Sequence, residues 1–161
     1  MNEVPLFSSL KIKSITLRNR IVLSPMCQYK AKNGMISDWH SQHYSRFAFS
    51  GLGAAFIEAT GVSPEGRIGH GCTGIWSDDH IEGLSKIAKI FKEYNCVSGI
   101  QLAHAGRKAS FLRPWDGAAP ITQDDQIEPA WQTIGPSAIP INENSPVPRE
   151  MSLEDINSVK Q

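Results

Sequence analysis

The apolar residues of this chain form two kinds of pattern that alternate along the sequence. Short apolar runs without clean alternation occupy 21–26, 54–60 and 97–104. Between them, 40–50 and 81–91 carry apolar residues at the spacing of a helix. Short, continuously apolar strands separated by helices are typical of a parallel sheet. The pattern therefore predicts an α/β protein in the order strand, helix, strand, helix, strand.

The helix that starts near Ile81 has the clearest pattern. Its apolar face consists of Ile81, Leu84, Ile87, Ala88 and Phe91. Ser77, Asp78 or Asp79 is suited to cap its start, because each has a side-chain oxygen that accepts from a backbone N–H. Asn95 is suited to close its end.

The segments around this core predict other structures. Residues 6–20 alternate between apolar and polar positions, which predicts a short exposed hairpin that plugs one end of the sheet. The Asn-Gly pair at 33–34 predicts a turn. Residues 105–150 are rich in proline. A connection of this length is unusual in a compact domain unless it works as an active-site loop or a binding loop. Ser152 and Asp155 form a capping-box pair, which predicts a third helix.

Composition narrows the class of partner. The chain has 161 residues, of which 40% are apolar and 20% charged, as in globular proteins. Its 16 basic and 16 acidic residues cancel, so nothing indicates nucleic acid or a membrane surface as a partner. The expected partner is a small molecule. Residues 1–5 lack the pattern of a secretory signal and no apolar run is long enough to span a membrane, so we expect a cytoplasmic protein.

The three cysteines, Cys27, Cys72 and Cys96, are far apart and form no C-x-x-C motif. This spacing indicates neither a disulfide framework nor a zinc site. Cys72 and Cys96 are interpreted as structural. Cys27 differs because it follows the apolar residues at 21–23 and a proline, with Tyr29 close behind. In parallel barrels the residues that follow each strand face the ligand, so these two side chains are candidates for a site.

Several motifs occur together in the order seen in one enzyme family. They are Ser-Pro-Met-Cys-Gln-Tyr at 24–29, Trp-His-x-x-His-Tyr at 39–44, Glu-Ala-Thr-Gly-Val at 58–62, Gly-Ile-Trp-Ser-Asp-Asp at 74–79 and Gln-Leu-Ala-His-Ala-Gly-Arg-Lys at 101–108. The chain resembles the Old Yellow Enzyme family of NADH:flavin oxidoreductases. With its cysteine directly after Ser-Pro-Met, the chain resembles the thermophilic-like subgroup of this family. That subgroup contains xenobiotic reductases and bacterial NADPH dehydrogenases.

The resemblance implies a (β/α)8 TIM barrel. Because a complete barrel needs about 250 residues, the chain is expected to hold only the first three strand-helix units. Residues 1–161 are then the amino-terminal portion of a single FMN-binding barrel domain. Three parallel strands cannot close on themselves, so the inner face of the sheet is expected to stay bare.

The resemblance also implies a cofactor and a reaction. FMN takes hydride from NADPH or NADH and passes it to the β-carbon of an α,β-unsaturated carbonyl, and relatives also reduce nitro compounds. The full-length form is expected to be a homo-oligomer. By motif, the residues expected at the flavin are Ser24, Pro25, Met26, Cys27, Ala59 and Gln101. Tyr29 is expected at the substrate.

The residue types suit these roles. A glutamine amide offers both a donor and an acceptor to the edge of the flavin ring, so Gln101, as a buried amide, would find its partners in a ligand. A residue as small as Ala59 lets the backbone approach the ring. Cys27 is suited to tune the flavin potential through its sulfur rather than act as a nucleophile. The alternatives are a buried apolar thiol for Cys27 and a rim phenol for Tyr29.

Other candidates have simpler interpretations. His40 and His43 lie one helical turn apart, but no third metal ligand has a useful spacing, so both are interpreted as structural. Residues 69–74 match G-x-G-x-x-G, yet no strand leads directly into them, and a plain loop is the better interpretation. Arg107 and Lys108 either steer a phosphate or form a solvated pair.

In relatives, the next strands carry the histidines that hold the substrate carbonyl, a proton-donating tyrosine and the cradle for the FMN phosphate. The 161 residues contain none of these. The alternative hypothesis is therefore a truncated or split barrel fragment that is catalytically inactive. For this chain alone we expect weak or absent FMN binding and a tendency to aggregate.

Overall fold

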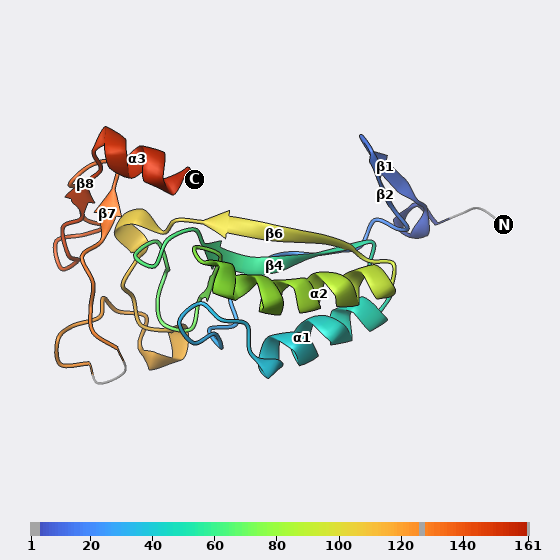
Figure 1. The fold of residues 1–161 in the computed structure, drawn as a ribbon, viewed down its shortest axis with the longest axis horizontal. Coiled ribbons are helices and arrows are strands. Elements are labelled where there is room, and N and C mark those ends of the chain that lie inside the picture. Colours follow the sequence, from blue (N-terminus) through green and yellow to red (C-terminus); the bar gives the residue numbers. More distant parts are fainter. Residues whose placement is uncertain (1–3, 126–127, 161) are drawn as a thin grey trace.

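The structure is a computed structural model that describes residues 4–125 and 128–160 (Figure 1). Residues 1–5 are interpreted above as lacking a secretory signal, and residues 1–3 of that segment lie outside the described residues. The strands are β1 (Leu10–Ile12), β2 (Ile15–Leu17), β3 (Val22–Leu23), β4 (Ala54–Gly61), β5 (Thr73–Gly74), β6 (Val97–Ala103), β7 (Ile134–Gly135) and β8 (Arg149–Glu150). The α-helices are α1 (Asp38–Phe49), α2 (Ile81–Glu93) and α3 (Leu153–Val159). Short 3-10 helices cover Pro5–Phe7, Asp78–His80, Gly106–Lys108 and Pro114–Asp116.

The central sheet is parallel, as predicted. β4 lies between β3 and β6, with Leu23 paired to Ala55 on one side and Ser98 paired to Ala55 on the other. β3 ends at Leu23 instead of reaching Met26, because Pro25 has no N–H to continue the ladder. The glycine-rich loop after β4 contains β5, a short strand that the sequence pattern did not predict and that pairs with the end of β4.

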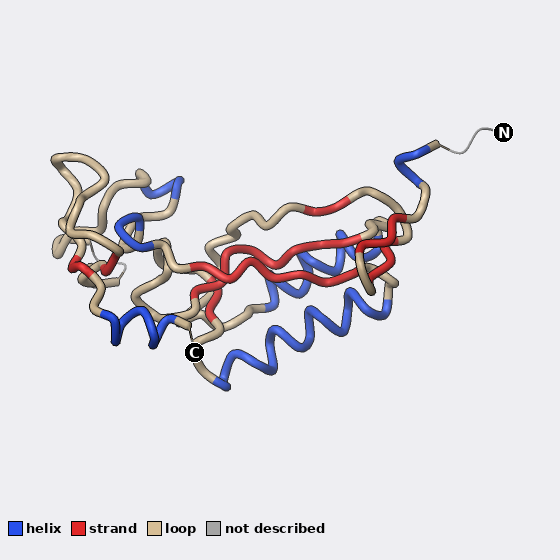
Figure 2. The backbone as a smooth tube through the Cα atoms, turned by 90° about the horizontal axis from the view of Figure 1, so that it is seen from above, coloured by secondary structure: helices blue, strands red, loops and turns tan. Residues whose placement is uncertain are grey.

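Both long helices pack on one face of the sheet (Figure 2). The buried core between these layers consists of Tyr44, Ala48, Ala55, Ile57, Ile87, Phe91 and Cys96. The rings of Tyr44 on α1 and Phe91 on α2 meet edge to face, with centroids 5.8 Å apart. On the opposite face, Val22 is 44% exposed and Phe56 38% exposed. The inner face of the described sheet is therefore bare, as expected for three strands of a barrel.

Two of the predicted helix ends are confirmed, and the third is shifted. Ser77 accepts a hydrogen bond from the Asp79 backbone N–H at 3.3 Å and so caps the 3-10 turn Asp78–His80 that leads into α2. The N-cap of α2 itself is His80, which makes no side-chain cap hydrogen bond. Asn95 follows α2 with a φ of 58°, the left-handed conformation that ends helices. At α3, Ser152 accepts from the Asp155 N–H at 3.1 Å and the Asp155 carboxylate accepts from the Ser152 N–H at 2.8 Å. This is the predicted capping box.

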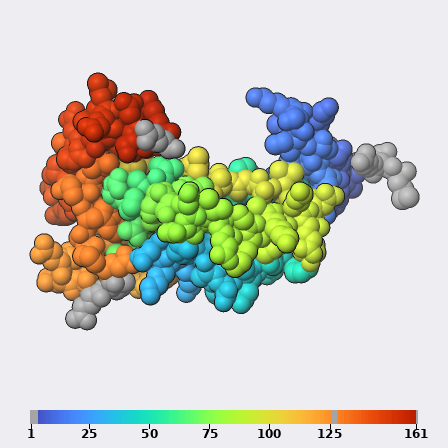
Figure 3. All heavy atoms as spheres, viewed as in Figure 1, coloured from blue at the N-terminus to red at the C-terminus, as the bar shows by residue number. Residues whose placement is uncertain are grey.

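The flanking segments lie at opposite ends of the molecule. β1 and β2 form the predicted antiparallel hairpin, which stands at the amino ends of the central strands (Figures 1 and 3). Residues 105–125 and 128–150 gather at their carboxyl ends. This segment is not wholly irregular, because its β7 and β8 pair in parallel through Ile134 and Arg149. The long connection therefore stands over the end of the sheet where the site residues were predicted.

Candidate functional site

Three neighbouring backbone segments bring the predicted residues together at the carboxyl end of the sheet. Ala59 of β4 is paired with Gln101 of β6. On the other side of β4, the Ala59 backbone is one of the neighbouring groups that lower the pKa of the Cys27 thiol. Cys27, Ala59 and Gln101 therefore lie side by side across three successive strand ends, although they are distant in sequence.

An irregularity in β4 sets the direction of Ala59. The register between β4 and β6 shifts between Ile57 and Ala59, so Glu58 is an extra residue in the ladder. Ile57 and its partner Ile100 pack toward the helices. Gln101 follows Ile100 and so faces the opposite way, and its partner Ala59 lies on the same face but is buried, with 9% exposure.

The expectation that Gln101 is a buried amide is wrong. Its side chain is exposed, since the inner face of the described sheet has no cover. Within 4–125 and 128–160, the Gln101 amide makes no side-chain hydrogen bond, so both its donor and its acceptor are available to a ligand. Ser24 and Met26 are also exposed, whereas Pro25 and Cys27 are partly buried. The structure thus places all these candidates along one end of the sheet.

A buried acid anchors the segment that carries Cys27. Glu58 and His40 are both 0% exposed, with His40 Nε2 3.3 Å from Glu58 Oε1. The other carboxylate oxygen, Oε2, accepts from the Gln28 backbone N–H at 2.7 Å. The Glu58 N–H donates to the Tyr44 hydroxyl at 2.9 Å. The sequence interpretation missed Glu58, whose signal was an acidic residue in the middle of an apolar strand.

The two histidines of α1 have the structural roles expected of them. His40 accepts from the Ser37 N–H at 3.1 Å through Nδ1, which caps the helix start. His43 packs edge to face on Tyr44 and Phe47, with centroids 5.0 Å apart in each case. Among the residues that the structure describes, no cluster of three or more His, Cys, Asp or Glu side chains is arranged to hold a metal.

Tyr29 stands at the rim of the site in a strained conformation. Its φ is 52°, in the left-handed region, and its ring meets Trp115 of the long connection edge to face at 5.7 Å. Lys30 Nζ lies 5.2 Å from the centre of the Trp39 ring and 5.9 Å from that of Trp115. Trp115 was not predicted as a site residue. Its only sequence signal was the neighbouring Arg-Pro in the long connection.

Burial and nearby charge change the acidity of the two reactive groups. The pKa of Tyr29 is raised to about 12. The largest cause is burial of the phenol, and the second is repulsion by the negative charge of the Cys27 thiolate. A hydrogen bond from Cys72 lowers the pKa of Cys27, and burial together with the Glu58 charge opposes this effect. At neutral pH, Tyr29 therefore carries its proton and is a hydrogen-bond donor.

We expect the Tyr29 phenol to ionise at about pH 12, above the ordinary value near 10. The measurement is an ultraviolet titration of the wild-type chain and of a Tyr29→Phe variant, whose difference isolates this phenol. A matched Tyr94→Phe variant controls for the loss of any one phenol. A Tyr29 transition at or below pH 10 would contradict the burial of this ring against its neighbours.

The glycine motif at 69–74 is a loop, as interpreted. A Cβ at Gly69 would lie 2.0 Å from the Phe111 carbonyl oxygen, and one at Gly74 would lie 2.1 Å from the Trp76 ring. These glycines therefore permit close contacts inside the protein. Arg107 and Lys108 are exposed on the 3-10 turn after β6, where Arg107 Nη1 donates to the Pro140 carbonyl at 3.5 Å.

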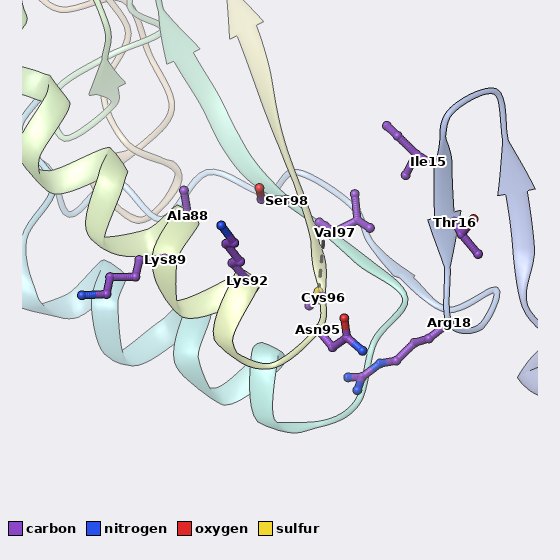
Figure 4. A pocket seen from close by; sticks show the side chains of 10 residues that line it. All are labelled: Ile15, Thr16, Arg18, Ala88, Lys89, Lys92, Asn95, Cys96, Val97 and Ser98. Atoms are coloured by element: carbon purple, nitrogen blue, oxygen red, sulfur yellow. Dashed lines mark hydrogen bonds between the residues drawn. The ribbon is translucent and has the colours of Figure 1, made fainter.

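A separate cleft lies at the other end of the sheet. It is formed by the hairpin, the last turn of α2 and the start of β6, and Arg18, Lys89 and Lys92 line it (Figure 4). Because it lies at the amino ends of the strands, it is distant from Cys27, Ala59 and Gln101. In parallel barrels the carboxyl ends carry the site, so this cleft is not the candidate.

Comparison with known proteins identifies the family. The sequence model of the NADH:flavin oxidoreductase / NADH oxidase family matches residues 5–161. The chain belongs to this family. The resemblance to Old Yellow Enzyme, drawn above from the motifs, is confirmed. Within the residues that the structure describes, no helix is both long and apolar enough to cross a membrane.

Relatives in the NADH:flavin oxidoreductase family include enzymes from bacilli. The chain is 44% identical to the NADPH dehydrogenase of Geobacillus thermodenitrificans (strain NG80-2) over 163 residues, which cover 100% of this chain and 42% of that protein. It is 41% identical to the NADPH dehydrogenase of Bacillus subtilis (strain 168) over 158 residues, which cover 97% of this chain and 41% of that protein. The chain therefore spans less than half the length of these relatives.

Solved structures support the fold. Morphinone reductase matches with a TM-score of 0.76 and 22% sequence identity, over 96% of this chain and 41% of that chain. The old yellow enzyme homologue from Zymomonas mobilis matches with a TM-score of 0.73 and 23% identity, over 96% of this chain and 41% of that chain. The α/β arrangement of this chain is thus that of part of a TIM barrel, as predicted.

Proposed function

We propose that this chain supplies the flavin-ring wall of an FMN-dependent, NAD(P)H-driven oxidoreductase. The proposed substrates are the C=C bonds of α,β-unsaturated carbonyls, and also nitro compounds. Residues 1–161 would be the amino-terminal portion of a single FMN-binding barrel, and the full-length form a homo-oligomer. The observation that carries the proposal is the alignment of Cys27, Ala59 and Gln101 across three strand ends, in a chain of this family.

The residues at this end fit the ring of a flavin. The exposed Gln101 amide offers one donor and one acceptor to the ring edge, and Ala59 beside it leaves room for a flat ring. Ser24, Pro25 and Met26 would line the ring from the first strand end. Once bound, FMN supplies the hydride chemistry, and the protein positions it and tunes its electronics.

Cys27 and Tyr29 have distinct proposed roles. Cys27 would place a polarisable sulfur near the flavin and shift its potential, which suits a thiol whose pKa is lowered by a hydrogen bond from Cys72. Tyr29 would donate a hydrogen bond to the substrate, because a phenol carries its proton at neutral pH and the raised pKa of Tyr29 extends this to higher pH. Neither role requires a covalent bond to the substrate.

An inactive barrel fragment is the second candidate. It is favoured by the bare inner face, where Phe56 is 38% exposed. Such a fragment would keep the Cys27, Ala59 and Gln101 wall but would not turn over substrate.

Flavin titration tests the proposal. FMN and riboflavin, which lacks the phosphate, are added in turn to the purified chain while flavin fluorescence is followed. If this chain contacts the ring, both should be quenched saturably with similar Kd values, which are expected to be weak for this chain alone, and the chain should melt cooperatively. Loss of quenching with both ligands would contradict the ring site. Bleaching by NADPH and recovery with cyclohexenone would reject the inactive fragment, whereas quenching without bleaching would support it.

Substitution of Gln101 tests the proposed contact. We expect Gln101→Leu to raise the Kd for FMN and for riboflavin about tenfold, since about 1.4 kcal/mol of hydrogen bonding is lost. Gln42→Leu, on the exposed side of α1, is the matched control and should leave both Kd values unchanged. Equal effects of the two variants would show that Gln101 does not bind the ring.

A further inference from the structure

Two thiols meet beside the candidate flavin site. Cys27 and Cys72 are both free cysteines, and each is the neighbour that changes the pKa of the other most. Cys72 is 1% exposed, whereas Cys27 is only partly buried. The sequence interpretation treated Cys72 as an isolated structural residue, because nothing in its spacing pointed to Cys27. The tertiary structure makes the two a pair.

Backbone contacts fix the two segments that carry these thiols. The Ala31 N–H donates to the Gly71 carbonyl at 2.9 Å. Gly71 has a φ of 82°, and a Cβ there would lie 2.3 Å from the Tyr29 carbonyl oxygen. A side chain at Gly71 would therefore push the segments apart. A parallel bridge between Gly34 and Thr73 continues the contact. The closeness of the thiols thus follows from the packing of the main chain.

The two thiols differ in access and in acidity. The hydrogen bond from Cys72 lowers the pKa of Cys27, and the same bond, with burial, raises the pKa of Cys72. Cys27 is therefore the thiol that ionises first and the one that solvent can reach. A thiolate with solvent access is the group that reacts with oxidants, and a neighbouring thiol then resolves the product.

We propose that Cys27 and Cys72 form an oxidisable dithiol that closes to a disulfide when a hydroperoxide reaches Cys27. The Cys27 thiolate attacks hydrogen peroxide, the O–O bond breaks, and a sulfenic acid and water result after protonation. The Cys72 sulfur then attacks the Cys27 sulfur, an S–S bond forms, and the S–O bond breaks. Hydroxide leaves with the Cys72 proton as the second water. Two thiols thus lose two electrons and two protons, which reduce the peroxide.

The proposed disulfide would act on the flavin site. If Cys27 lines the flavin, as proposed above, its conversion to a disulfide removes the thiol from the ring and pulls the 27–29 segment toward Cys72. This consequence rests on the proposed function, but the disulfide itself does not. Its formation needs only the two thiols and a peroxide.

The test uses the whole 161-residue chain without flavin. The folded chain is treated with hydrogen peroxide, remaining thiols are alkylated, and the peptides are mapped by mass spectrometry. We expect a peptide that joins Cys27 to Cys72, reversible by dithiothreitol, with Cys96 alkylated. The Cys96→Ser variant should give the same product. In Cys72→Ser, the Cys27 sulfenic acid should persist and react with dimedone.

The same treatment in guanidinium chloride provides the control for proximity, since an unfolded chain should lose the preference for Cys72. Pairing of Cys27 with Cys96 as often as with Cys72 in the folded chain would overturn the proposal. So would oxidation of Cys27 to a sulfinic acid with Cys72 still alkylatable. Because no flavin is present, a negative result here leaves flavin binding untouched, and absent flavin binding leaves this result untouched.

Discussion

Replacement of Glu58 by alanine should lower the free energy of unfolding by about 3–5 kcal/mol, the range for breaking a buried pair. The variant leaves the Gln28 N–H without its acceptor. It also removes the carboxylate oxygen that lies 3.3 Å from His40 Nε2, in a site where Glu58 and His40 are both 0% exposed. An unpartnered buried polar group destabilises a protein more than a lost contact alone. Urea unfolding followed by circular dichroism measures the change.

The matched control is Glu93→Ala, because Glu93 is exposed on the last turn of α2. Its effect should stay within about 0.5 kcal/mol. Glu58→Gln keeps the size of the side chain and should be less harmful than the alanine variant. If Glu58→Ala and Glu93→Ala unfold at the same urea concentration, then Glu58 does not anchor the segment that carries Cys27.

Replacement of Phe91 by alanine should also lower the free energy of unfolding by about 3–5 kcal/mol, since a large ring is removed from a packed core. Phe91 of α2 is 0% exposed, and its ring packs against the Tyr44 ring of α1. Urea unfolding measures this change as well. The cavity would lie between the helices and the sheet, away from the proposed flavin ring.

Phe7→Ala is the control for Phe91→Ala, because Phe7 is 62% exposed and the same atoms are removed. We expect a change within about 0.5 kcal/mol. Equal losses for the two variants would mean that the helix layer does not hold the sheet. A loss confined to Phe91→Ala would support a cooperative core in this three-strand unit.

The sequence by itself determined the order of the three central strands, the three α-helices and the hairpin, and it determined the family. Apolar runs too short for helices marked the strands, and Ser77, Asn95 and Ser152 marked helix ends through their own side-chain and backbone chemistry. These signals are local, so they can be read without knowing which segments meet. The motifs at the strand ends likewise placed Cys27 and Gln101 at one end of the sheet.

Only the tertiary structure decided which of these residues touch. The bulge at Glu58, which turns Ala59 to the bare face, depends on register between two strands. The pairing of Cys27 with Cys72 depends on a backbone contact at Gly71. The exposure of Gln101 depends on what covers the inner face. Each is a relation between segments distant in sequence, so no local pattern of side chains could specify it.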